Sequence, residues 1–295
     1  MKFGYIRAEP IRSLRTTLTI LCLALAVASR LHAQPTNQPA TNHVLLLDGT
    51  NSYLELPPNI FNDLDDATVE VWLKWERLGG PGRNRVFNYG SAGHDLSIVT
   101  KDSDTLWFVV VDANHGFQEV AVHGVLKLNE WIHVAAVSGK GGMRVYVNGR
   151  LAGQNPNPGS FSALKSGELN RLGKTVTQND ADPPFQGQLD EVRIWKMERT
   201  EEEIRQGMSR KVTGQEPGLV GLWNFDDPAN SGRDASPSGH HGKLMGNAQI
   251  LPASIRPSVP SAEPEKVLTL AGNGNYLERS DGRGDVCNRK REELT

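Results

Sequence analysis

The feature that most constrains this chain is a succession of short apolar runs, rich in Val, Ile, Leu and Trp, between residues 43 and 251. Gly, Asn, Asp and Pro interrupt these runs at short intervals, a texture that predicts many short strands and an all-β fold. We expect strands at residues 44–47, 68–75, 106–111, 131–137, 143–147, 188–195 and 219–225. Such strands bury their apolar side chains between packed sheets.

The run at residues 68–75 shows how one strand divides its side chains between two faces. Successive side chains of a strand point to opposite sides of the sheet. One face carries Val69, Val71, Leu73 and Trp75, and the other carries Thr68, Glu70, Trp72 and Lys74. We therefore expect the first set to lie in the core.

Two local signals fix further elements. Asn148 and Gly149 stand between two extended runs and predict a tight hairpin, because both residue types accept positive φ. Thr200 followed by Glu203 forms a capping box that predicts a helix over residues 201–208. One helix of this length cannot form a layer of its own. The fold class we expect is all-β, a two-sheet antiparallel β-sandwich (jelly roll) with one short helix at its end.

The first 33 residues read as a secretory signal peptide. They hold five basic residues against one acidic residue, followed by an apolar run over residues 18–28 and small residues before Gln34. We expect cleavage after Ala33, with Ala28 as the alternative. An uncleaved anchor is the rival interpretation, but the run is shorter than the roughly 20 residues that span a bilayer. The mature protein is then secreted or periplasmic and has no membrane span.

Cysteine usage agrees with this division of the chain. Cys22 leaves with the signal and Cys287 is alone in a polar tail, so we expect no intramolecular disulfide. The net charge of -2 and the lack of a long basic run argue against a nucleic-acid partner.

The chain repeats itself after its structured part. Residues 34–42 and the Pro-rich residues 252–266 read as linkers around one domain at 43–251. Residues 267–278 align without gaps on residues 44–55, with seven of twelve positions identical. They predict the first strand of an incomplete second copy, followed by an unstructured tail at 279–295. We hypothesise a truncated or frame-shifted reading frame, and treat Arg283-Gly-Asp285 in the tail as a chance tripeptide.

Six blocks in this order resemble a known family. They are LDGTNSYLEL from residue 47, ATVEVWLK from 67, WIHVAAV from 131, MRVYVNGRLAG from 143, FQGQLDEVRIW from 185 and EPGLVGLWNFD from 216. Together they resemble a laminin G-like jelly-roll domain of the concanavalin A-like lectin and glucanase superfamily. The resemblance covers residues 43 to about 250 and implies the fold. It implies less about function, because this superfamily includes lectins, adhesion modules, pentraxins and glycosidases.

Catalysis is not what these residues predict. Glycosidases need two carboxylates about 5 to 10 Å apart, and the related glucanases carry them as Glu-x-Asp-x-x-Glu on one strand. No such string occurs in this chain. Strict alternation also places Asp190 and Glu191 on opposite faces of their strand. We therefore expect no enzyme, and keep a glycosidase only as a minority reading.

The resemblance implies a structural calcium ion in some members. Asp190 corresponds to an aspartate that joins oxygens of the N-terminal strand in the calcium site of related glucanases. Asp48 is the partner that we expect for it, since a hard cation prefers carboxylate and carbonyl oxygens. The alternative is that Asp48 only stabilises its turn and Asp190 pairs with an arginine.

Sugar binding requires an aromatic platform with hydrogen-bonding groups beside it. Glu70, Trp72, Arg144 and Tyr146 are the residues that we expect to form one, although core burial is the alternative for most of the tryptophans. The function that we expect is a secreted, non-catalytic recognition module that binds a glycan and belongs to a larger protein. The alternative is a structural or adhesive spacer that binds an extracellular protein.

Overall fold

The computed structural model describes residues 1, 4, 41–79, 82–101, 104–177 and 182–252. The expected signal peptide, the second linker beyond Pro252, the repeated segment and the tail lie outside the described residues, as does the first linker up to residue 40. Within the described part, no helix is long and apolar enough to cross a membrane.

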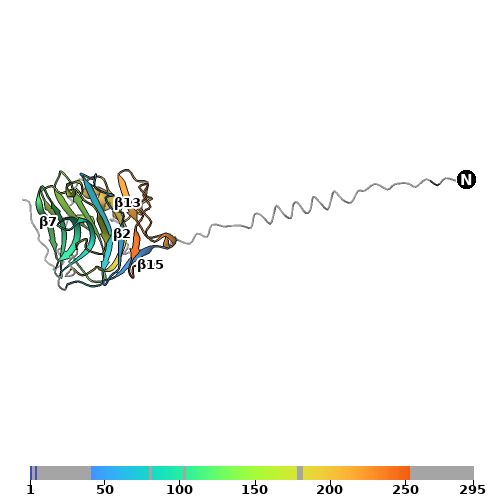
Figure 1. Ribbon diagram of the computed structural model, residues 1–295, viewed down its shortest axis with the longest axis horizontal. Coiled ribbons are helices and arrows are strands. Elements are labelled where there is room, and N and C mark those ends of the chain that lie inside the picture. Colours follow the sequence, from blue (N-terminus) through green and yellow to red (C-terminus); the bar gives the residue numbers. More distant parts are fainter. Residues whose placement is uncertain (2–3, 5–40, 80–81, 102–103, 178–181, 253–295) are drawn as a thin grey trace, which may run out of the picture.

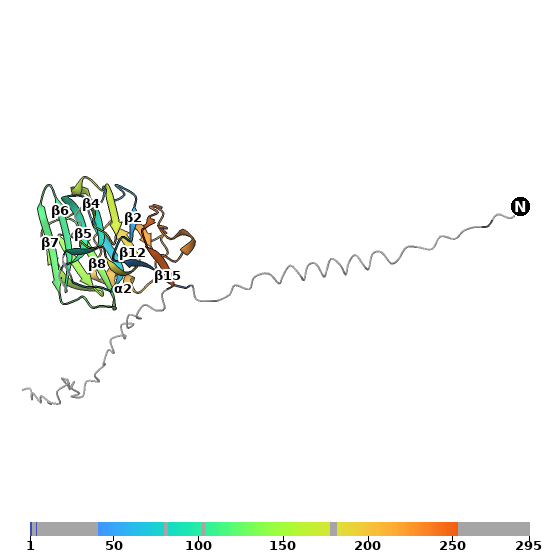
Figure 2. The same cartoon turned by 60° about the horizontal axis from the view of Figure 1, so that its bottom comes forward.

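The described chain forms two antiparallel sheets. The first sheet has the strand order β10 (Arg150–Asn155), β9 (Met143–Val147), β8 (Trp131–Ser138), β3 (Ala67–Trp75), β12 (Gln186–Trp195), β1 (His43–Asp48) and β15 (Gln249–Pro252), with β13 (Leu219–Trp223) also paired to β12. The second sheet has the order β14 (Lys243–Met245), β2 (Tyr53–Leu56), β11 (Leu169–Leu172), β4 (Arg83–Ser91), β5 (His94–Lys101), β6 (Thr105–Asp112) and β7 (Gly116–His123). Figures 1 and 2 show β7 at one end of the sandwich and β15 at the other.

Three short helices complete the described elements. They are the 3-10 helices η1 (Ser162–Leu164) and η2 (Pro228–Asn230), and the α-helix α2 (Glu201–Met208). The two-sheet all-β sandwich with one α-helix confirms the fold class that the sequence predicts.

The core lies between the two sheets. One face of β3 contributes to it as the alternation predicts, because Val69, Val71, Leu73 and Trp75 are all buried there. The second sheet contributes side chains such as Leu54, Phe87, Ile98 and Phe108 to the same core. Aligned sheets with interdigitated inner faces make up the usual core of a sandwich.

The predicted local signals are confirmed. Asn148 has a φ of 50° and Gly149 a φ of 74°, and they join β9 to β10 in a tight hairpin. The Thr200 side chain accepts from the Glu203 backbone N–H, and the Glu203 side chain accepts from the Thr200 backbone N–H. The capping box therefore starts α2 where the sequence places it.

The second face of β3 is also buried, which alternation alone does not predict. Thr68 donates its hydroxyl hydrogen bond to the Met197 carbonyl at 2.8 Å, and the Trp72 indole Nε1 donates to the Met208 carbonyl at 2.9 Å. The segment that carries α2 thus covers the outer face of the first sheet. This segment therefore also covers the residues that we expected to bind a sugar.

Candidate functional site

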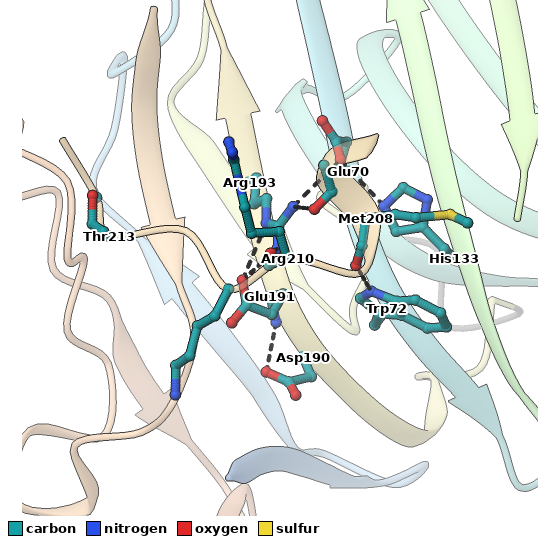
Figure 3. Close-up of polar contacts among 12 residues, drawn as sticks. Glu70, Trp72, His133, Asp190, Glu191, Arg193, Met208, Arg210 and Thr213 are labelled. Atoms are coloured by element: carbon teal, nitrogen blue, oxygen red, sulfur yellow. Dashed lines mark hydrogen bonds and ion pairs between the residues drawn. The ribbon is translucent and has the colours of Figure 1, made fainter. Parts of the chain in front are cut away.

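Glu70 lies at the centre of a buried network of charges beneath α2 (Figure 3). One carboxylate oxygen, Oε1, pairs with the Arg199 guanidinium. The other oxygen, Oε2, lies 3.2 Å from His133 Nε2 and 3.8 Å from Arg193. Arg193 also pairs with Glu191 at 2.7 Å.

Burial and charge act against each other on the pKa values of this network. Burial alone would raise the pKa of Glu70, but the adjacent His133 imidazole and the charges of Arg199 and Arg193 lower it to about 2. Burial also lowers the pKa of His133, against the opposite influence of Glu70. At neutral pH the network therefore contains an ionised Glu70 and a neutral His133.

The same network holds the end of α2 in place. Arg193 donates to the carbonyl oxygens of Gly207 at 2.9 Å and Arg210 at 2.8 Å. The last carbonyls of a helix have no partner within the helix and need donors from elsewhere. The buried guanidinium supplies a donor to Gly207 and also binds the Arg210 carbonyl just after α2, so this cluster of charges has a structural role.

The four residues predicted to bind a ligand lie on one face, but that face is covered. Tyr146, Ala135 and Glu70 form one row across β9, β8 and β3. Trp72 is only 3% exposed, and Tyr146 packs with Ile204 of α2. The predicted sugar platform must be corrected, because the α2 segment fills the space that a sugar would need.

Arg144 is the most accessible of the four predicted residues. Its guanidinium pairs with Glu198, in the segment just before α2. This ion pair fastens the segment to β9 and again indicates a structural contact.

The predicted calcium pair is also corrected. Asp48 lies opposite Gln186 in the pairing of β1 with β12, four residues away from Asp190. At about 3.3 Å per residue the backbones of the two aspartates are about 13 Å apart along the strands. Their carboxylate oxygens would each have to lie within about 2.6 Å of one calcium ion, which is more than two Asp side chains can span. Asp48 and Asp190 therefore do not share one ion.

Asp48 instead stabilises its own turn. Asp48 accepts from the Ser52 hydroxyl at 2.6 Å, the Thr50 backbone N–H at 2.9 Å and the Asn247 amide at 2.9 Å. The Ser52 hydrogen bond is the largest cause that holds the pKa of Asp48 below its usual value. Among the described residues no group of three or more His, Cys, Asp or Glu side chains could hold a metal ion.

A bulge in β12 changes the faces expected for its carboxylates. Asp190 lies opposite Trp72 while Arg193 lies opposite Glu70, so the register shifts between them. Glu191 has a φ of 48° and its carboxylate contacts Arg193 on the covered face. Strict alternation is therefore wrong at this point. Asp190 and Glu191 are both buried, which leaves them unsuited to catalysis on a polysaccharide.

An accessible aromatic surface lies on the outer face of the second sheet. We call Arg83, Lys101, Trp107, Phe117 and His123 the Trp107 face. The Trp107 and Phe117 rings are 5.8 Å apart between centroids, with an angle of 65° between their planes. Phe117 is 49% exposed, and Trp107 is 6% exposed because neighbouring side chains lie over its ring. The exposed Phe117 ring therefore offers solvent an apolar surface that the covered Trp72 does not.

The β5–β6–β7 register places these side chains on one face of the sheet. Val99, Trp107 and Ala121 form one row across the three strands, and Val109 and Glu119 belong to the next. Val99, Trp107 and Val109 pack as a separate apolar cluster on this outer face. The rings therefore stand on a rigid floor, with the Glu119 carboxylate beside them.

Two grooves next to β14 are the rival location for a ligand. They measure about 370 and 640 Å³ and share His241, Gly242 and Lys243 in their walls. Neither groove is lined by Trp, Tyr or Phe. We therefore favour the Trp107 face as the candidate functional site.

The two sheets and the aromatic residues on the outer face place this protein in the class of jelly-roll β-sandwiches. The model of the Laminin_G_3 family, described as the concanavalin A-like lectin/glucanases superfamily, matches residues 48–205. This chain belongs to that family. The comparison with curated protein sequences gives no match.

Solved structures show the same fold at low sequence identity. A protein from Bacteroides ovatus ATCC 8483, described provisionally as a carbohydrate binding protein, is 18% identical with a TM-score of 0.54. The likeness covers 74% of this chain and 61% of that protein, so this chain spans less than two thirds of its length. At this identity the likeness concerns the fold alone.

Two weaker likenesses have lower TM-scores. The heptameric SAP-like pentraxin of Limulus polyphemus is 14% identical, with a TM-score of 0.48 and 75% of this chain and 94% of that chain covered. The CBM40 of the Ruminococcus gnavus IT-sialidase, bound to α2,3-sialyllactose, is 11% identical, with a TM-score of 0.46 and 55% and 95% covered.

Proposed function

We propose that this protein is a secreted, non-catalytic carbohydrate-binding module of a larger protein, and that it binds glycans on the Trp107 face. The observation that carries the proposal is the exposed Phe117 ring beside Trp107, on a rigid apolar floor. The apolar faces of sugar rings stack on such aromatic side chains, while nearby polar groups bind the hydroxyls. Family membership and the description of the Bacteroides ovatus protein support the same class of ligand.

The Trp107 face suits binding better than hydrolysis. Glu119 and Asp95 are the carboxylates in the rows of β5, β6 and β7 that pass through Trp107, Val109 and Phe117, and Asp95 is buried and accepts a hydrogen bond from Asn88. Glycoside hydrolysis generally needs two carboxylates, one on each side of the bond that is cleaved. A single carboxylate serves as a hydrogen-bond acceptor for hydroxyl groups. Export and the larger parent protein rest on the basic apolar leader and on the repeat at residues 267–278.

A glycan array tests this function directly. Residues 34–295, applied with and without calcium, should bind at least one class of glycan on the array. Binding to no glycan, together with retention of an extracellular protein ligand, would favour the adhesive alternative. Release of reducing sugars from a polysaccharide would contradict the non-catalytic assignment.

Phe117→Ala should weaken binding to the best glycan of the array by about tenfold, which corresponds to about 1.4 kcal/mol. The reason is the loss of the exposed half of the aromatic pair, and the measurement is titration calorimetry. Leu151→Ala is the matched control, because Leu151 is 44% exposed on β10 of the other sheet. Equal binding by Phe117→Ala and the unchanged protein would move the site away from the Trp107 face.

A further inference from the structure

The Trp107 ring is flanked by two cations. The Lys101 ammonium lies 4.4 Å from the ring centroid and the Arg83 guanidinium carbon lies 5.0 Å from it. Arg83 and Lys101 are also direct partners in the pairing of β4 with β5. Like charges that lie directly opposite each other in an antiparallel pair repel and destabilise it. The Trp107 face therefore holds two positive charges in an unfavourable position.

The row that contains these cations continues across the sheet. Lys101 lies opposite Thr105, and Thr105 lies opposite His123. The Thr105 hydroxyl is 3.0 Å from His123 Nδ1. Arg83, Lys101, Thr105 and His123 thus form one line of hydrogen-bonding groups beside the Trp107 ring.

The carboxylates near this row are engaged elsewhere. Asp182 pairs through Oδ2 with Arg85, and its Oδ1 accepts from the backbone N–H of Arg83 at 3.0 Å. Asp104 accepts from the Thr105 hydroxyl at 3.2 Å. Within the described residues, no carboxylate forms an ion pair with the side chain of Arg83 or of Lys101. In the described part of the chain, the positive charges of Arg83 and Lys101 are therefore available to an anionic ligand.

Two of the other cation–aromatic contacts among the described residues have an acid beside the cation. Arg171 lies over Tyr53, but its direct strand partner is Glu55. Arg199 lies over Trp195 and pairs with Glu70. At the Trp107 face two cations flank one ring without such an acid among the described residues, which favours an anion next to an apolar ring.

We propose that the Trp107 face selects acidic glycans, with a carboxylate or sulfate group of the sugar between Arg83 and Lys101 and a sugar ring on the exposed Phe117. This inference rests on the proposed glycan-binding function. An anion between the two cations removes their mutual repulsion and makes charge-assisted hydrogen bonds. Glu119, in the Val109 row, lies at the opposite side of Trp107 from the cationic row and meets the neutral hydroxyls.

Matched pairs of glycans test this selectivity with residues 34–295. One arm compares an oligouronate with its methyl ester, and a second arm compares a sulfated galactan oligosaccharide with the unsulfated one. In at least one arm the acidic glycan should bind at least about tenfold more tightly than its neutral counterpart. This difference in affinity should become smaller as salt is added. The arm that shows the difference identifies the anionic group. Equal or tighter binding of the neutral member in every pair that binds would overturn the selectivity.

Charge variants separate selectivity from binding itself. Lys101→Gln and Arg83→Gln should each weaken the acidic member by about tenfold and change the neutral member less than twofold. Lys74→Gln is the matched control, since it removes a cation that lies 5.6 Å from the Trp131 ring on the other sheet. If the unchanged protein binds no glycan, both the selectivity and the proposed function are contradicted. If both variants bind the acidic glycan as tightly as the unchanged protein, only the role of the two cations is contradicted.

Discussion

Glu70→Gln is expected to lower the free energy of unfolding by about 3–5 kcal/mol, the cost of breaking a buried ion pair on one side. The substitution keeps the shape of the side chain but removes the charge that Arg199 and Arg193 face inside the protein. The Arg199 guanidinium then loses its carboxylate partner and Arg193 keeps only Glu191, so the hold of Arg193 on the Gly207 carbonyl of α2 weakens. Urea unfolding of residues 34–295 measures the change through the transition midpoint.

The Glu70 prediction also has a definite pH dependence. Its folded pKa of about 2 lies below the ordinary value of 4.5, so the folded state binds the proton less readily than the unfolded state. The stabilisation from this group is present above pH 4.5 and is lost as the pH falls towards 2. The difference between the unchanged protein and Glu70→Gln should therefore narrow over that range.

A matched variant separates this buried network from surface charge. Glu202→Gln removes an acid from an exposed pair with Arg205 on α2. Such exposed pairs contribute about 0–1 kcal/mol. A Glu70→Gln effect no larger than that of Glu202→Gln would show that the buried network does not stabilise the fold.

Local rules of sequence account for much of this fold. Asn148-Gly149 specifies its hairpin and Thr200 with Glu203 specifies the start of α2, because these signals act over a few neighbouring residues. The alternation in β3 places Val69 and Trp75 in the core for the same reason. Alternation does not reveal what covers the other face of a strand. Trp72 is therefore buried by a segment 136 positions further along the chain, at Met208.

The candidate site depends on register, which one sequence does not specify. The acids Asp48 and Asp190 were paired by resemblance, and the β1–β12 register separates them. Arg83, Lys101 and Trp107 meet only because β4, β5 and β6 are adjacent with a bulge between Arg85 and Phe87. The predictions from the sequence did not include this face, although the alternation of Trp107, Val109 and Val111 is a signal that could have indicated an apolar outer face.

Gly187→Ala is expected to lower the free energy of unfolding by at least about 3 kcal/mol, because a side chain has no room where β12 crosses the middle of the first sheet. Gly187 has a φ of 153°, which L residues rarely adopt. A Cβ atom at this position would lie 2.1 Å from the Lys74 carbonyl oxygen and about 3 Å from the Phe185 ring. The clash is with backbone, so the pairing of β12 with β3 must shift.

Gly93→Ala separates this clash from the strain of positive φ. Gly93 has a φ of 86° in the turn between β4 and β5, and an added Cβ would meet nothing within 4 Å. We expect a cost of about 1 kcal/mol for the strained φ alone. Equal losses in the two variants, measured by urea unfolding, would mean that the contact with Lys74 relaxes without cost. A much larger loss of unfolding free energy for Gly187→Ala would show that the pairing of β12 with β3 tolerates no side chain at this position. This pairing would then be one of the contacts that specify the sandwich on which the Trp107 face lies.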